Sequence, residues 1–414
     1  MNLLKNNKME DEIPKIGICG FRNIGNTCYM NSILQLLIHS EVFISFLLDS
    51  KFNDYITQAT LEKLASIKRK KENLSNTDEV SIDRSLIRES EKMLIILKLY
   101  DIINLNVNKG NAVITPTSLK QNIDIKLRMF RGYSQHDAHE FLLHLLDTII
   151  DETGIESEPI INNIPKTIQN YIDLINLAKD EIKNTENIED KKNIIHKINN
   201  FKNNNKEIIN KFNGLQYMKK VFKQKYNPFI FQLNNFMINY ITCNNCNNTT
   251  CNYENNTIIS LPIEQNIYDS LNKYTQQEQL EDYKCEICKS NQVAFKSCKF
   301  WRSPILLFIQ LKRFKQFPNG RLVKDNTHVE IPHTLDLSNY YDSTSDVNNK
   351  LYNNYKLKGI SNHHGGLNGG HYTADCINIT DKKWYHFDDS TVSKYSNDII
   401  NTSSAYILMY EINS

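Results

Sequence analysis

Apolar residues recur at helical spacing in the first half of the chain, most clearly between Ser134 and Asp151. Ser134 and Asp137 form a Ser-x-x-Asp pattern at the start of this segment, which is typical of a helix N-terminus. A second apolar run, Thr27 to Leu37, is also predicted to be helical, and the charged segment Lys51 to Ser81 partly so. The apolar positions of the clearest helix are Phe141, Leu142, Leu145, Leu146, Ile149 and Ile150.

From Pro228 onward the pattern changes to short runs of β-branched and aromatic residues separated by Gly, Asn, Asp and Pro. Such runs predict β-strands bounded by turns. A helical first half followed by a strand-rich second half predicts an α+β fold. The predicted strands include Ile305 to Leu311, Tyr355 to Ile360, His371 to Ile377 and Ala405 to Tyr410.

The segment from Glu152 to Lys225 is rich in Asn, Lys and Ile and poor in aromatic residues. Within it, Asn199 to Asn205 lacks any packing period. We therefore expect a polar insertion on the surface of a domain, partly helical and partly mobile. Because an Asn/Lys/Ile-rich proteome would produce the same composition, the segment predicts no function.

Composition limits the partners of the chain. Its 414 residues are 40% hydrophobic and 23% charged, which is typical of a soluble globular protein. The net charge of +2 provides no field to attract nucleic acid or an anionic membrane, so we expect neither partner. The apolar stretch Ile33 to Leu48 is too polar and too short to span a bilayer. Met1 to Glu10 lacks a signal-like apolar segment, which predicts a cytoplasmic location, with the nucleus as the alternative.

Cys28 is the candidate nucleophile. It follows a Gly- and Asn-rich loop, in which Asn26 or Thr27 can serve as N-cap, and precedes an apolar helix. Backbone N–H groups and the helix dipole stabilise a thiolate in a first helical turn. Asn23, just before, is a candidate donor to the oxyanion that a thiolate attack on a carbonyl creates. The alternative for an isolated cysteine is a small buried residue that packs a helix start.

His371 is the candidate base. Four glycines lie among the six residues before it, so a peptide can approach closely. If Asn378 to Asp381 form a four-residue hairpin turn, Ile377 faces Lys382 and His371 lies directly opposite Asp388. A carboxylate there can hold the imidazole in the required tautomer. A change of register by one residue brings in Asp389 instead, and a purely structural His–Asp pair is the alternative.

Two Cys-x-x-Cys pairs predict a metal site. Nine cysteines in a chain without a signal segment indicate metal binding and catalysis in a reducing compartment rather than disulfides. Four thiolates hold Zn²⁺ tetrahedrally and leave no position for water, so we expect a structural Zn²⁺ and no catalytic cofactor. Free thiols are the alternative, and Cys251 and Cys298 are potential competitors. The predicted ligands are Cys243, Cys246, Cys285 and Cys288.

At five places the sequence resembles the ubiquitin-specific protease family, in the order in which that family has them. The resemblance extends from Gly17 to Ile412, apart from the Asn-rich insertion. The stretch from Tyr355 to Asp389 contains Gly369-Gly370-His371-Tyr372-Thr373-Ala374 and Trp384-Tyr385-His386-Phe387-Asp388-Asp389. The five stretches are Gly20 to Gln35, Gly132 to Phe141, Gln310 to Phe314, Tyr355 to Asp389 and Ser404 to Tyr410.

The resemblance implies a papain-like cysteine peptidase with thumb, palm and zinc-ribbon fingers. It implies a tail over residues 1–16, a catalytic domain over 17–414 and fingers over about 230–300. It makes Cys28 the nucleophile, His371 the base and Asp388 its orienting partner. The other implied site residues are Asn23 in the oxyanion hole, Asp389 as an assisting acid, Asp137 facing the basic tail of ubiquitin, and Gly369, Gly370 and Tyr372 lining the channel for its Gly-Gly terminus.

The implied activity is a deubiquitinating cysteine protease, with ubiquitin and ubiquitinated proteins as partners, acting as a monomer through a thioester. Two alternatives stay open from the sequence. One is a catalytically weak ubiquitin-binding module, although retention of the full set of site residues argues against it. The other is a protease for another ubiquitin-like modifier that ends in Gly-Gly.

Overall fold

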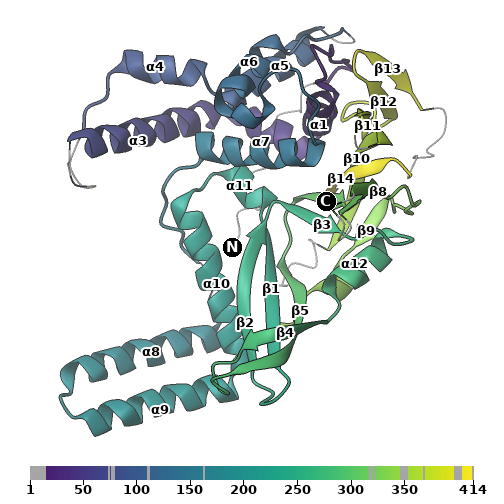
Figure 1. Cartoon of the computed structure of the whole chain (residues 1–414). Helices are drawn as coiled ribbons and strands as arrows, with labels where there is room; N and C mark the ends of the chain where they lie inside the picture. Colours follow the sequence, from purple (N-terminus) through teal and green to yellow (C-terminus); the bar gives the residue numbers. More distant parts are fainter. Residues whose placement is uncertain are drawn as a thin grey trace.

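The computed structural model describes residues 15–72, 75, 80–109, 112–161, 164–316, 320, 322–345, 353–366, 369–395 and 403–412. A layer of helices, α1 to α7, precedes the sheets along the chain, and we call it the thumb (Figure 1). No single helix among the described residues is long and apolar enough to cross a membrane; α1 and α2 pass that test only together, across an 82° bend, and pack largely in the core. The thumb contains α1 (Cys28–Ile38), α2 (Glu41–Leu47), α3 (Phe52–Glu72), α4 (Arg84–Lys92), α5 (Ile95–Lys109), α6 (Thr117–Lys126), a 3₁₀ turn η1 (Arg128–Phe130) and α7 (Ala138–Thr153).

The palm is a mixed sheet of eight strands against which the thumb packs. Its strand order is β13-β12-β11-β10-β14-β6-β3, with β9 paired to β10 and only β3 parallel to its neighbour. A two-stranded ribbon and a short 3₁₀ turn accompany the sheet. The palm strands are β3 (Ile258–Leu261), β6 (Leu306–Leu311), β9 (Thr334–Asp336), β10 (Asn354–Gly366), β11 (Gly369–Ile377), β12 (Trp384–Asp388), β13 (Thr391–Lys394) and β14 (Ala405–Ile412); the ribbon is β7 (Phe314–Gln316) and β8 (Leu322–Lys324), and the turn is η2 (Ser338–Tyr340).

The fingers are a separate antiparallel sheet in the order β2-β1-β5-β4. Their strands extend away from the thumb and palm, and a pair of helices projects beside them (Figure 1). The strands are β1 (Asn235–Cys243), β2 (Thr249–Asn256), β4 (Glu278–Lys284) and β5 (Asn291–Arg302), and the accompanying helices are α8 (Lys166–Asn184), α9 (Ile188–Asn204), α10 (Lys206–Gln224), α11 (Pro228–Leu233) and α12 (Ile267–Thr275).

The structure confirms a helical first half and a strand-rich second half and corrects two local predictions. Helix α7 begins after Asp137, not at Ser134, because the Asp137 carboxylate accepts the N–H groups of His139 and Glu140. The predicted insertion is helical over most of its length, and α9 extends to Asn204 through the segment that lacks a packing period in the sequence.

The insertion and the fingers share a third hydrophobic core. Leu215, Met218 and Phe222 of α10 are buried with Phe236 and Trp301 of the fingers. The other two cores lie on the two faces of the palm sheet, one of them shared with the thumb. Of the predicted tail, residues 1–14 lie outside the described residues, whereas Ile16 is buried and its N–H donates to Oγ1 of Thr380 at 2.9 Å.

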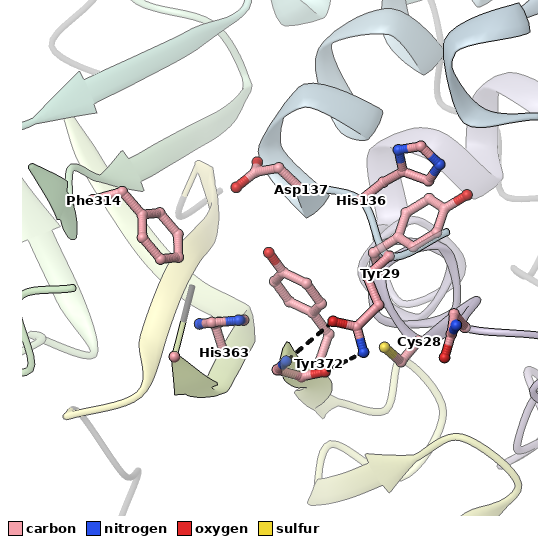
Figure 2. A pocket seen from close by; sticks show the side chains of 11 residues that line it. Cys28, Tyr29, His136, Asp137, Phe314, His363 and Tyr372 are labelled. Carbon is pink, nitrogen blue, oxygen red and sulfur yellow. Dashed lines mark hydrogen bonds between the residues drawn. The ribbon is translucent and has the colours of Figure 1, made fainter. Parts of the chain in front are cut away.

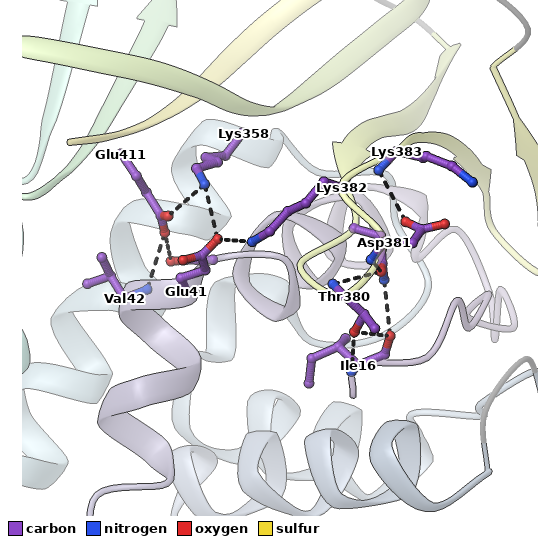
Figure 3. Close-up of polar contacts among 11 residues, drawn as sticks. Ile16, Glu41, Val42, Lys358, Thr380, Asp381, Lys382, Lys383 and Glu411 are labelled. Atoms are coloured by element: carbon purple, nitrogen blue, oxygen red, sulfur yellow. Dashed lines mark hydrogen bonds and ion pairs between the residues drawn. The ribbon is translucent and has the colours of Figure 1, made fainter. Parts of the chain in front are cut away.

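Charged side chains join the start of α2 to the palm sheet (Figure 3). Lys358 of β10 lies 3.2 Å from Oε1 of Glu41 and 3.7 Å from Oε2 of Glu411, and Lys382 lies 2.7 Å from Glu41. The Glu411 carboxylate is 4% exposed, accepts the hydroxyl of Ser40 and has its pKa raised by burial. Lys358 is therefore the cation that balances a buried charge at the junction of thumb and palm.

We expect Lys358→Met to lower the free energy of unfolding by about 3 kcal/mol at pH 7, because it leaves the Glu411 carboxylate buried without a cation. Since burial raises the pKa of Glu411, the carboxyl is protonated as the pH falls, and the loss should shrink at pH 5. Denaturant titrations of wild type and variant at pH 7 and pH 5 measure the loss of unfolding free energy at each pH. Lys382→Met is the control: its side chain is 61% exposed, and its loss should cost under about 1 kcal/mol. A loss for Lys358→Met that is equal or larger at pH 5 contradicts the prediction.

Candidate active site

Cys28 is the first residue of α1 and is 4% exposed. Thr27 occupies the N-cap position, as one of the two predicted alternatives, but its hydroxyl accepts the N–H of Ile24 at 3.1 Å instead of capping the helix. The preceding loop passes through the left-handed region at Gly25 (φ 115°) and Asn26 (φ 52°). This turn brings the loop sharply into the helix, so the sulfur lies among the free N–H groups of the first turn.

The environment of the Cys28 thiol raises its pKa. Burial is the largest cause, and the charge of Asp389 adds to it. Backbone N–H groups of Tyr372, Tyr29 and Cys28 itself favour the thiolate but do not outweigh burial. The helix start alone therefore leaves the thiol protonated at neutral pH, and its activation needs a base.

His371 and Asp388 form the predicted pair, in a register that was predicted wrongly. Ile377 faces Trp384 rather than Lys382, because the turn between the strands includes Lys383 and is two residues longer than expected. Asp388 therefore lies diagonally across from His371, yet its Oδ1 is 2.6 Å from Nε2 of the imidazole. A long side chain reaches a diagonal neighbour, so the contact survives the shift.

The pairing of Nε2 with Asp388 leaves Nδ1 of His371 for the nucleophile. Among the described residues, no hydrogen bond joins either ring nitrogen to the Cys28 sulfur. The imidazole is 41% exposed, whereas the thiol is buried. The imidazole and the Asp388 carboxylate are thus in contact in this structure, whereas the imidazole and the thiol are not hydrogen-bonded.

Asn23 is held by Asp389. The Oδ1 atom of Asn23 accepts the N–H groups of Gly25 and Thr27, both at 3.1 Å, and these bonds fix the orientation of the Asn23 amide. Its Nδ2 donates one hydrogen to Oδ2 of Asp389 at 2.9 Å; within the described part of the chain the second hydrogen has no acceptor, so it is available to an oxyanion. Asp389 also accepts Nδ2 of Asn31 at 2.7 Å, so it is hydrogen-bonded to the nucleophile helix, while one of its carboxylate oxygens lies within 4.8 Å of a ring nitrogen of His371.

A cavity of about 320 Å³ lies between thumb and palm, with Cys28 among its lining residues. Figure 2 shows Phe314 and His363 toward one end and Cys28 toward the other. Asp137, Tyr372 and Gly370 line it as predicted, whereas Gly369 is not among its lining residues. A Cβ on Gly370 would collide with Nε2 of His363, so only glycine fits this wall. The remaining lining residues are Asn26, Tyr29, Gln135, His136 and Gly366.

Asp137 has two contacts in the cavity wall. Its Oδ1 caps α7, as the sequence allows, and its Oδ2 accepts the hydroxyl of Tyr406 at 2.7 Å. The hydroxyl therefore ties the thumb to β14 of the palm. Burial and the Asp137 charge raise the pKa of Tyr406 well above its usual range, so this phenol remains a donor.

His363, Phe314 and Gln135 are cavity residues to which sequence reasoning assigned no role. All three lie inside the quoted stretches, so the motifs included them without indicating which side chains face the channel. The His363 ring lies 4.7 Å from Tyr372 and 5.3 Å from Phe314, between centroids. Burial lowers the pKa of His363 to about 4, so it forms a neutral aromatic wall at neutral pH.

The four predicted metal ligands converge at the end of the fingers. Their sulfur atoms all lie within 4.8 Å of one another. The sulfur–sulfur distances are 3.9 Å for Cys243–Cys288 and 3.6 Å for Cys246–Cys285. They match the sulfur–sulfur distance of about 3.8 Å in a tetrahedral Zn–S₄ site. The competitors lie elsewhere: Cys251 donates to Oδ1 of Asn210 and Cys298 to the carbonyl of Tyr274.

Comparison with known proteins places these features in a family. Residues 19–410 match the family model described as Ubiquitin carboxyl-terminal hydrolase. The chain is 28% identical over 429 residues to the probable ubiquitin carboxyl-terminal hydrolase R319 of Acanthamoeba polyphaga mimivirus, which covers 95% of this chain and 90% of the relative. It is 28% identical over 415 residues to ubiquitin carboxyl-terminal hydrolase 2 of Homo sapiens, covering 96% of this chain and 56% of the relative. The chain thus spans most of the viral relative and about half of the human one.

Solved structures agree with the predicted fold. The SAGA Ubp8/Sgf11/Sus1/Sgf73 DUB module bound to ubiquitin aldehyde matches with a TM-score of 0.60 and 23% identity, covering 97% of this chain and 71% of that one. A yeast SAGA DUB module that carries a mutant Sgf73 matches with a TM-score of 0.58 and 22% identity, covering 97% and 70%. This likeness confirms the α+β fold with thumb, palm and fingers.

We expect Asp389→Asn to increase the rate at which iodoacetamide alkylates Cys28 at pH 7.5 by about threefold. The Asp389 charge is one cause of the raised pKa, so its removal lowers the pKa of the thiol and increases the thiolate fraction. Asn also tolerates the left-handed conformation of this position (φ 49°). Mass spectrometry of the Cys28 peptide measures the rate, with Asp282→Asn in the fingers as the control. An unchanged or slower rate contradicts this electrostatic account.

Proposed function

Because this chain belongs to the ubiquitin carboxyl-terminal hydrolase family of cysteine-type deubiquitinases, we propose that it hydrolyses the bond after the C-terminal Gly-Gly of ubiquitin. The observation that carries this proposal is the geometry around Cys28. A buried thiol at a helix start lines a narrow cavity, and an assembled His371–Asp388 pair lies beside the glycine wall of that cavity.

The proposed reaction proceeds through a thioester. Nδ1 of His371 accepts the proton of Cys28 as the sulfur attacks the glycine carbonyl, while Nε2 remains bound to Asp388. The oxyanion accepts the free hydrogen of Asn23 Nδ2 and an N–H of the first turn of α1. The protonated His371 then donates to the leaving amine, and water that His371 deprotonates hydrolyses the thioester.

The cavity supports selectivity for a Gly-Gly terminus. Its palm side includes Gly366 and Gly370 together with the rings of Tyr372, His363 and Phe314, and its thumb side includes Cys28 and Tyr29. Between these rings there is room for the main chain of glycine residues, which carry no side chain. The Asp137 carboxylate lies at the same cavity and supplies a negative charge for the basic residues that precede the glycines in ubiquitin.

We expect ubiquitin with a C-terminal electrophile to form a covalent adduct with the wild-type chain and none with Cys28→Ala. The attack needs the sulfur, and alanine removes it while leaving every other lining residue of the cavity unchanged. Intact-mass measurement detects the adduct, and Cys251→Ala, whose sulfur lies outside the cavity, is the matched control that should label fully.

Other outcomes distinguish the alternatives. If the wild type binds ubiquitin without labelling, the chain is a binding module rather than an enzyme. If probes that carry another Gly-Gly modifier label it and ubiquitin does not, the chain is a protease for that modifier. The predicted monomeric state and cytoplasmic location stay predictions.

We also propose that the four fingers cysteines bind a structural Zn²⁺. The sulfur distances support this, and so do the N–H of Cys288 and the amide of Asn245, which donate to Sγ of Cys285 and of Cys288 at 3.4 and 3.3 Å. Such donors stabilise thiolates, which are the form that binds the metal. A closed set of four sulfurs stabilises the fold and takes no part in the reaction.

We expect purified protein to contain about one zinc ion per chain, and Cys285→Ser to remove most of it. Because structural zinc contributes folding free energy, the variant and a chelator should each lower the melting temperature. Elemental analysis with thermal unfolding measures both effects. Cys251→Ser, in the same sheet but outside the cluster, should retain the metal; a full zinc content in Cys285→Ser argues against the assigned ligands.

A further inference from the structure

The side chain of Gln135 bridges thumb and palm across the cavity. Its Nε2 donates to the carbonyl of Gly370 at 3.2 Å, and the N–H of Gly370 donates to its Oε1, also at 3.2 Å (dashed lines in Figure 2). A primary amide carries the same donor and acceptor as a peptide group. Gln135 therefore binds Gly370 as a residue of a neighbouring antiparallel strand would.

Gly370 lies on an edge of β11 that none of the described strands covers. On one side β11 pairs with β10, where Gly370 faces Gly365. On the other side, β12 pairs with β11 only from Ala374 to Ile377. The N–H and C=O of Gly370 point to Gln135 and not to β10, so they lie on the side that β12 leaves uncovered. Such an edge is a site at which an extended peptide can add as a further strand.

The backbone on both sides of Gln135 is fixed. Nδ2 of Asn26 donates to the carbonyl of Tyr133 at 2.7 Å, and the Tyr406 hydroxyl holds Asp137. Upstream, Nζ of Lys120 donates to the carbonyl of Gly132 at 2.9 Å. Because these contacts hold the loop, the Gln135–Gly370 bridge can open by rotation of the exposed Gln135 side chain alone. This opening breaks only the two hydrogen bonds between Gln135 and Gly370.

We propose that Gln135 is a latch that opens for each conjugate, after which the main chain of the modifier's tail pairs with the N–H and C=O of Gly370. This rests on the proposed function. A tail with a folded protein at each end cannot be threaded lengthwise beneath a closed bridge, so it enters sideways. A tail that ends in a small leaving group enters lengthwise. Gln135 thus discriminates between substrates by the size of their leaving group.

The test compares two substrates. One is ubiquitin with a small fluorogenic amide at its C-terminus, and the other is ubiquitin linked to a folded protein through a lysine. Gln135→Leu keeps the approximate size of the side chain and removes both hydrogen bonds. Any contact of Gln135 with the tail affects both substrates alike, so the ratio of the two kcat/KM values isolates the latch. We expect the ratio of conjugate to small amide to rise about threefold to tenfold.

Gln169→Leu is the matched control, because Gln169 is an exposed glutamine on α8 whose side chain bonds only to Asp173 among the described residues. It should leave the ratio at the wild-type value. An unchanged or lower ratio for Gln135→Leu, with the wild type cleaving both substrates, overturns the latch and leaves the proposed function intact. If the wild type cleaves neither substrate, the proposed function fails, and the latch fails with it.

Hydrogen exchange tests the second half of the proposal. In the free chain, Gln135→Leu should expose the Gly370 amide and increase its exchange rate about tenfold. In the covalent adduct of the variant with the ubiquitin electrophile, that amide should be protected again, because the tail pairs with it where Gln135 no longer can. An amide that stays fast in the variant adduct shows that the tail does not use this edge.

Discussion

The site depends on the junction at Asp389. Its backbone carbonyl accepts the N–H of Phe21 at 2.8 Å, and its carboxylate accepts the amides of Asn23 and Asn31. Each hydrogen bond to a charged acceptor contributes about 1.5–3 kcal/mol. A Cβ on Gly20 would collide with the backbone of Ser390, so the two segments approach as closely as glycine allows. Asp389 thereby joins the start of the nucleophile helix to the strand that carries Asp388.

The same junction has a chemical cost. A carboxylate close to the sulfur disfavours the thiolate, and burial disfavours it further. Asp389 thus holds Asn23 and Asn31 in place, which on the proposed mechanism serves the oxyanion, and it does so at the expense of the thiolate. The first turn of α1 does not offset these two effects, so on the proposed mechanism the thiolate forms when the proton passes to His371.

Short sequence motifs predicted much of the site. The errors arose where contacts between residues far apart in the sequence determine the structure. The His371–Asp388 contact was predicted although the register was wrong, because a longer turn, with Lys382 in a left-handed conformation (φ 57°), shifts the strand without moving Asp388 out of reach. The insertion was predicted to be polar and partly mobile, because its packing partner, Trp301, is far along the chain. Gln135 and Gly370 are 235 residues apart, and no local pattern connects them.

Strong and weak contacts are distributed unequally around the cavity. The hydrogen bonds of Asp389 and the Asp137–Tyr406 bond hold thumb and palm together. The Gln135–Gly370 contact is weak, and among the described residues a Cys28–His371 hydrogen bond is absent. Both of these pairs involve β11. Their β11 residues are sequence neighbours. On the proposed mechanism, a tail that pairs with the edge at Gly370 replaces the weak contact and fixes the backbone beside the base. Binding energy gained along the channel is then available to position His371 against the sulfur, so the proper substrate itself completes the site.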